Sequence, residues 1–189
     1  MTSQVLEIRK HHNNIKRDLI LRVVPAGASV LDVGCGNGGD LQKWHAAKVK
    51  NLVMCDPGSL EEVKSRHKNL KLPMKVQFID GDIRRCPMQQ FDIVAYNFSL
   101  HFIFETRALF ETSVKEIRSR LRVGGRLIGV IPDSEHIIMD TPFEDPVSAM
   151  DIQAPVQGGF GEHLLVYLAK TPYFKDGVRR FQRVETSAV

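Results

Sequence analysis

Apolar residues recur along this chain at two different spacings, and segments of the two kinds alternate. Short apolar runs that end at glycine or at a polar residue predict buried strands, and they occupy residues 29–34, 51–56, 75–82, 91–97 and 126–131. Apolar positions three or four residues apart predict amphipathic helices between the strands, over residues 39–48, 59–70 and 106–121. Gly124 and Gly125 are expected to end the last of these helices.

A further helix is expected before the first strand, over residues 4–23. One face of this helix would carry Val5, Ile8, His12, Ile15, Leu19 and Val23. After Ile131 the pattern weakens, and the prolines and glycines of residues 132–161 indicate a long irregular segment that would serve as a lid or substrate loop. Residues 162–170 predict a strand, and residues 178–184 predict a last strand that pairs with it.

Alternating strands and helices are typical of a parallel sheet that is covered on both faces. We therefore predict an α/β fold: a doubly wound, mostly parallel, Rossmann-like sheet of the seven-stranded type, whose C-terminal strands are shortened or reorganised. The chain of 189 residues would form a single domain. Its parts would be an N-terminal helix (1–24), a cofactor-binding α/β core (28–132), and the substrate loop with the last strands (133–189).

A glycine-rich turn follows the first predicted strand and opens the next helix. In "VLDVGCGNGGDLQKW" the glycines have the spacing Gly34-x-Gly36-x-x-Gly39, which is typical of nucleotide-binding turns. Asp56 ends the next predicted strand, where an acid can hold both hydroxyls of a ribose. Because ligands of such sheets bind at the carboxyl ends of the strands, this context indicates a cofactor that contains adenosine.

Acidic residues around the turn distinguish two kinds of cofactor. Asp32 lies just before the turn and Asp40 in the first turn of the following helix, and both would repel the pyrophosphate of a dinucleotide. S-adenosylmethionine carries a sulfonium and an ammonium group instead, so these carboxylates favour it. Asp82, at the end of the third predicted strand, could then accept a hydrogen bond from the adenine amino group.

Composition and charge narrow the setting. The chain is 43% hydrophobic and 25% charged, as in soluble globular proteins, and its net charge of +4 permits a polyanionic partner without requiring one. The N-terminus is too polar for a secretory signal, and no apolar run is long enough to span a membrane. The three cysteines form neither a disulfide framework nor a metal-binding spacing. These features predict an intracellular protein without a metal.

Four stretches together resemble the messenger-RNA cap guanine-N7 methyltransferases, a family of class I S-adenosylmethionine-dependent enzymes. The glycine turn is one of them. The others are "HHNNIKRDLI" in the first helix, "YNFSLHFIFE" after the fourth strand, and "LRVGGRLIGVIPDS" before and through the fifth. The resemblance covers about residues 8–135, with a weaker match at "GEHLLVYL". Other domains or subunits of a capping enzyme, viral or cellular, are then expected as partners.

The resemblance implies roles for particular residues. Lys16, Gly34 and Asp40 would contact the methionine end of the cofactor, Asp56 its ribose and Asp82 its adenine. The full cofactor-binding set is Lys16, Asp32, Gly34, Gly36, Asp40, Asp56, Asp82, Asn97, Ser99 and Phe102. The cap-binding set, which would line the guanine pocket and hold the base edge, is His12, Asn13, Phe98, His101 and Glu162. Two positions depart from the family pattern: His12 replaces an asparagine, and Phe102 a tyrosine.

The implied reaction moves a methyl group from S-adenosylmethionine to guanine N7 of the 5′ GpppN cap of mRNA. N7 attacks with a lone pair and has no proton to lose, so no catalytic residue is expected, and alignment of the reactants suffices. The alternatives are another class I methyltransferase, acting on RNA ribose 2′-O or on a small molecule, and a non-catalytic methyltransferase-fold partner of a capping enzyme. Capped RNA would be met in the nucleus or cytoplasm, or in the cytoplasm or virion for a viral protein.

Overall fold

The computed structural model describes residues 3–131, 143–144, 148–152, 160, 163–168 and 182–185. The chain forms two compact units. The first consists of Ile15–Leu100 and Glu111–Ile131, and the second of Met1–Asn14, His101–Phe110 and Pro132–Val189. The helices are α1 (Ser3–Val23), α2 (Leu41–Ala46), α3 (Glu61–Leu70) and α4 (Arg107–Arg120), with short 3₁₀ helices η1 (Ile83–Arg85) and η2 (Leu100–Glu105).

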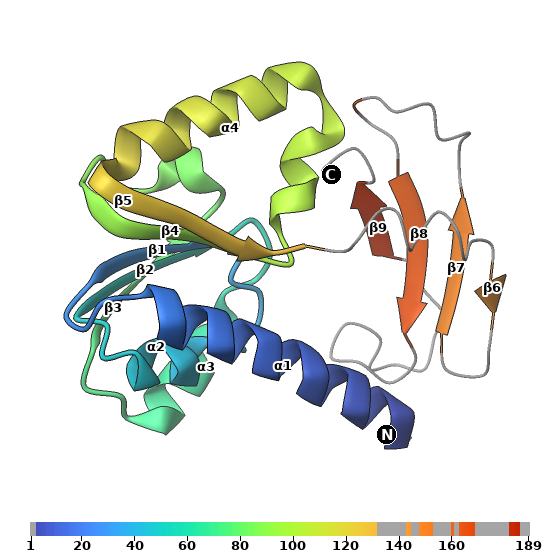
Figure 1. The fold of residues 1–189 in the computed structure, drawn as a ribbon, viewed down its shortest axis with the longest axis horizontal. Helices are drawn as coiled ribbons and strands as arrows, with labels where there is room; N and C mark the ends of the chain where they lie inside the picture. The colour runs from blue at the N-terminus through green and yellow to red at the C-terminus, as the bar shows by residue number, and fades with distance from the viewer. Residues whose placement is uncertain are drawn as a thin grey trace. The chain divides into compact units, whose positions relative to one another are not determined.

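A parallel sheet of strands β1 to β5 is the framework of the first unit (Figure 1). Its strands are β1 (Ser29–Val33), β2 (Asn51–Asp56), β3 (Lys75–Asp80), β4 (Phe91–Asn97) and β5 (Leu121–Val130). Their order is β3-β2-β1-β4-β5, and α4 lies on one face while α2 and α3 lie on the other (Figure 1). The predicted α/β, doubly wound architecture is confirmed. The order reverses between β1 and β4, so a crevice for ligands is expected there.

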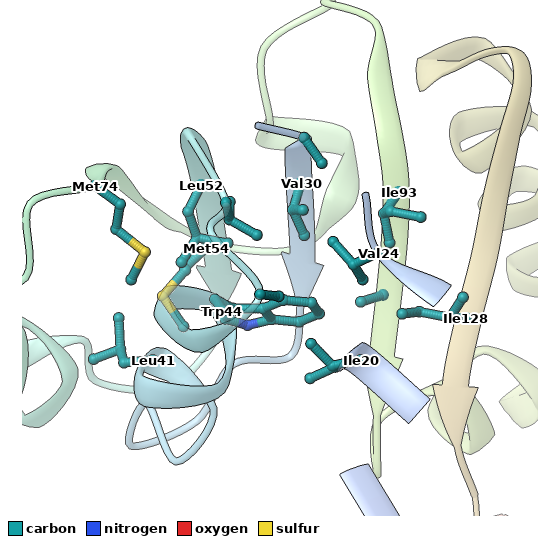
Figure 2. Packing of buried hydrophobic residues seen from close by; sticks show 14 of the residues in the cluster. Ile20, Val24, Val30, Leu41, Trp44, Leu52, Met54, Met74, Ile93 and Ile128 are labelled. Atoms are coloured by element: carbon teal, nitrogen blue, oxygen red, sulfur yellow. The ribbon is translucent and has the colours of Figure 1, made fainter. Parts of the chain in front are cut away.

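Trp44 fills the centre of the core beneath this sheet (Figure 2). Its side chain is fully buried among Ile20, Leu41, Met54 and other apolar residues of α1, α2 and the strands. A buried indole N–H needs an acceptor, and Trp44 Nε1 donates to Asp32 Oδ2 at 2.9 Å. The carboxylate of β1 is therefore part of the core rather than of the sheet's edge.

The parallel sheet has five described strands, in keeping with the predicted shortening of the seven-stranded type. Two other expectations within this unit are wrong in detail. Helix α4 ends at Arg120, and β5 begins at Leu121 before the two glycines that were expected to stop the helix. The register between β4 and β5 shifts between Phe91 and Ile93, so the extra residues around Gly124 (φ +78°) are accommodated as an irregularity of the strand. On α1, Ile15 is 40% exposed, and Ile20 is buried in its place.

The second unit contains a four-stranded antiparallel sheet in the order β6-β7-β8-β9. The strands are β6 (Phe143–Glu144), β7 (Ser148–Ile152), β8 (His163–Leu168) and β9 (Gln182–Glu185). The predicted strand at 162–170 and its pairing with the last strand are confirmed, because β8 pairs with β9. The prediction that residues 132–161 are irregular throughout is wrong, since β6 and β7 form there. Among the described residues, no helix is long and apolar enough to cross a membrane.

Candidate functional site

The glycine turn is closed by hydrogen bonds to the end of β2. The amides of Gly34 and Cys35 donate to the Cys55 carbonyl, at 2.8 and 3.1 Å. The next residue of β2, Asp56, accepts from Gly36 N at 2.7 Å and from Gly58 N at 2.8 Å. Asp56 therefore lies at the carboxyl end of its strand, as predicted, and its carboxylate holds the turn in shape.

Gly34 lies where the end of β1 packs closely against the segment after β4. Its φ is +75°, and a Cβ atom built on it would lie 2.3 Å from Ser99 Cβ. Ser99 is buried and its Oγ donates to the Val33 carbonyl at 2.6 Å. Gly34 and Ser99, both predicted to bind the cofactor, thus lock the end of β1 to the segment after β4.

Asp40 is the centre of a buried charge cluster. Lys16 Nζ and Lys43 Nζ each lie 2.8 Å from Asp40 Oδ1, and Asn97 Nδ2 donates to Oδ2 at 3.1 Å. The residue is the N-cap of α2 instead of a member of its first turn, and its side chain makes no capping bond. Three elements, α1, α2 and β4, therefore converge on one carboxylate.

Lys43 was absent from the sequence-based site. It is only 4% exposed, and burial lowers the pKa of its ammonium group although the neighbouring Asp40 acts in the opposite direction. Its Nζ also donates to the Gly39 carbonyl at 2.8 Å. A lysine three residues after the acid on a helix was the only available signal, and that spacing is ordinary for exposed ion pairs.

Phe98 has a strained backbone directly after β4. Its φ is +62°, a conformation that bulky residues rarely adopt. Its amide donates to the Val130 carbonyl at 2.7 Å, and the flanking Asn97 and Ser99 are fixed by the bonds described above. Lys16 Nζ lies 5.8 Å from the centre of the Phe98 ring. Strain held this firmly is typical of functional sites.

The electrostatic argument drawn from Asp32 and Asp40 is not supported by the geometry. Asp32 is buried against Trp44, and burial raises the pKa of its carboxyl to about 7, with a smaller contribution from Asp40. Asp40 is paired with two lysines, so its negative charge is already more than compensated. A different feature disfavours a pyrophosphate, because the Gly36 amide that it would need already donates to Asp56.

The raised pKa of Asp32 predicts a pH-dependent stability. Between its ordinary value of 3.8 and about 7, the folded protein binds more protons at this carboxyl than the unfolded chain does. The stabilisation is complete below the lower value and is lost as pH rises through the upper one. Asp32→Asn keeps an acceptor for Trp44 and cannot ionise. In urea denaturation, the free energy of unfolding of the variant should rise by about 1–3 kcal/mol relative to that of wild type between pH 4 and pH 8. Parallel pH profiles would contradict this assignment.

Asp82 lies two residues beyond the end of β3 instead of in the strand. Its Oδ1 accepts from Arg84 N and from Arg84 Nε, both at 2.9 Å. The side-chain bond from Arg84 is the main reason that the pKa of this carboxyl is lowered. Contact with an adenine amino group therefore requires an oxygen that Arg84 shares.

The other predicted site residues lie in the second unit. Both ring nitrogens of buried His101 lack a hydrogen-bond partner in the described part of the chain, and burial lowers the pKa of this imidazole to about 4. Its ring centre is 4.1 Å from that of Phe102, which is 40% exposed. On α1, Asn13 Nδ2 donates to the Arg9 carbonyl, and His12 is half-buried. Glu162 lies outside the described residues.

The sheet order and the glycine turn define a Rossmann-like fold of the class I methyltransferase type. Solved structures agree with this class. The PH0226 protein from Pyrococcus horikoshii matches with a TM-score of 0.67 and 17% identity, covering 95% of this chain and 75% of that one. An S-adenosylmethionine-dependent methyltransferase from Clostridium acetobutylicum matches with a TM-score of 0.57 and 16% identity, over 90% and 68% of the two chains.

The particular family follows from sequence comparison. The model of the mRNA (guanine-N(7))-methyltransferase domain matches residues 1–145, and the chain belongs to this family. It is 34% identical over 149 residues to the mRNA cap guanine-N(7) methyltransferase of Candida glabrata. The aligned region covers 71% of this chain and 36% of that protein. The protein of the same name from Saccharomyces cerevisiae is also 34% identical, over 71% of this chain and 34% of its own length. The chain thus spans about a third of these curated relatives.

Proposed function

We propose that this protein transfers a methyl group from S-adenosylmethionine to N7 of the guanine that caps messenger RNA. The observation that carries the proposal is the family match over residues 1–145, because that range contains every described residue of the predicted cofactor and cap sites. The relatives that match it are mRNA cap guanine-N(7) methyltransferases. The remaining support comes from the chemistry of the side chains at the carboxyl ends of β1, β2 and β4.

The described residues suit S-adenosylmethionine. Asn97 Oδ1 is buried and has no hydrogen-bond partner among the described residues, and it lies on the same amide that donates to Asp40. A buried acceptor of this kind calls for a donor. The cofactor's ammonium group would donate there and to Asp40, while Lys16 would bind its carboxylate. Asp56 would hold the ribose and Asp82 the adenine.

The bound cofactor supplies an electrophilic methyl group on its sulfonium. This chain would bind the two reactants and orient guanine N7 toward that group, with no proton to remove. Phe98, held in its strained conformation, would present an aromatic face to a base, and His101 would remain neutral at physiological pH because burial disfavours its charged form. His12, Asn13, Phe102 and Glu162 keep their predicted roles as proposals.

Two of the alternatives, ribose 2′-O transfer and a non-catalytic role, fit the described site less well. Ribose 2′-O transfer must remove a hydroxyl proton, and the aspartate expected after β4 for that purpose is replaced by Asn97-Phe98-Ser99. A non-catalytic partner has no need of a cofactor site, yet Asp56, Asp40 and the glycine turn form an organised cluster.

The proposal is tested with isotope-labelled S-adenosylmethionine and three short RNAs of the same sequence, carrying a GpppG cap, a 7-methylated cap or a free triphosphate. We expect label only on the GpppG-capped RNA, and nuclease digestion should release it as 7-methylguanosine cap. Label on ribose, or equal labelling of the triphosphate RNA, would falsify the assignment. Binding of the labelled cofactor without transfer to any RNA would favour the non-catalytic alternative.

A further inference from the structure

The two lysines that contact Asp40 are not equivalent. Lys16 reaches the carboxylate from α1 and keeps 14% of its side chain exposed. Lys43 has 5% of its side chain exposed and is also bonded to the Gly39 carbonyl, one residue before Asp40. Moving Lys43 away would therefore break two contacts, one to Asp40 and one to the Gly39 carbonyl, whereas moving Lys16 would leave both of these contacts in place.

A buried carboxylate that loses its only counter-ion is strongly destabilised. Since Lys43 and Asn97 both stay with Asp40, Lys16 can leave it at modest cost. The cluster of two ammonium groups and one carboxylate also carries one net positive charge. That charge favours a ligand with a carboxylate of its own, such as the amino-acid end of the proposed cofactor.

We propose that Lys43 is the permanent counter-ion of Asp40 and thereby a positioning residue for the amino-acid end of the cofactor. It holds Asp40 toward the cofactor's ammonium group and releases Lys16 to bind the cofactor's carboxylate. Without Lys43, Lys16 becomes the only cation on Asp40 and is retained there. This inference rests on the proposed function, because it assumes that the site binds S-adenosylmethionine.

The experiment compares two ligands in isothermal titration calorimetry with Lys43→Met. S-adenosylhomocysteine has the amino-acid end, and 5′-methylthioadenosine keeps the adenosine and a thioether but lacks that end. We expect the variant to bind S-adenosylhomocysteine about 10- to 100-fold more weakly and methylthioadenosine within about twofold of wild type. Lys50→Met, at an exposed lysine beyond α2, is the matched control and should change neither affinity.

Equal weakening of both ligands would overturn the proposal, because it would mean that Lys43 only supports the glycine turn. Unchanged binding of S-adenosylhomocysteine would overturn it too. Lys43→Gln guards against misfolding, since its amide can still donate to the Gly39 carbonyl without a charge, and it should show the same loss of discrimination. Wild-type protein that binds neither ligand would refute the proposed function itself, whereas discrimination by wild type that Lys43→Gln retains refutes only the role of Lys43.

Discussion

Replacing Gly34 with alanine should destabilise the protein by about 2–5 kcal/mol, and replacing Gly39 should cost less than about 1 kcal/mol. At Gly34, φ is +75°, and the added Cβ would meet Ser99 Cβ at 2.3 Å. Neither side can give way easily, because Ser99 is buried and bonded to the Val33 carbonyl. At Gly39 nothing lies within 4 Å of an added Cβ, and its φ is not positive. The measurement is urea denaturation followed by circular dichroism.

A second substitution separates the two causes of the Gly34 effect. In the double variant Gly34→Ala with Ser99→Gly, the steric clash is gone, while the cost of the left-handed backbone and the lost Ser99 hydrogen bond remain. We therefore expect the double variant to be more stable than the sum of the two single effects predicts. Simple additivity would mean that contact with Ser99 does not limit this position. A Gly39→Ala variant as unstable as Gly34→Ala would contradict the assigned geometry.

The glycine turn shows how far spacing alone can be trusted. The motif correctly located the turn between β1 and α2 and included Gly34, whose backbone requires glycine. It also counted Gly39 as its third glycine, although the backbone at Gly39 does not require one. In the structure another glycine of the turn that is constrained, besides Gly34, is Gly38, where φ is +72° and an added Cβ would lie 2.5 Å from Val63 Cγ2 of α3. Sequence spacing records where glycines stand, and the need for one depends on the backbone angle and on neighbours from distant segments.

The strands were predictable because short apolar runs are a local signal, and β2 and β4 have the bounds expected from the sequence. Asp56 could be placed for the same reason, since it ends such a run. The cluster around Asp40 could not be predicted, because Lys16, Lys43 and Asn97 come from three separate elements. The role of Asp32 was also misjudged, since only the tertiary packing of Trp44 shows that its carboxylate points into the core.

Asp56→Ala should weaken binding of S-adenosylhomocysteine by about 100-fold or more, because each charged hydrogen bond that is lost is worth about 1.5–3 kcal/mol. The Asp56 carboxylate has two roles. It accepts from Gly36 N at 2.7 Å and Gly58 N at 2.8 Å, and so fixes the turn, and it would also hold the ribose hydroxyls. Asp56→Asn can replace only one acceptor oxygen and should lose about tenfold. Calorimetry gives all of these affinities directly.

The neighbouring strand provides the control. Asp80 ends β3 in register with Asp56 on β2, but it is exposed, so Asp80→Ala removes the same charge at the same edge of the sheet without disturbing the turn. Its affinity for S-adenosylhomocysteine should stay within about twofold of wild type, because the exposed Asp80 carboxylate faces water, where charge interactions are weak. If Asp80→Ala weakened binding as much as Asp56→Ala, the loss would be a general effect of charge. If Asp56→Ala bound normally, the ribose would have to lie elsewhere, and the carboxyl end of β2 would not be the cofactor site.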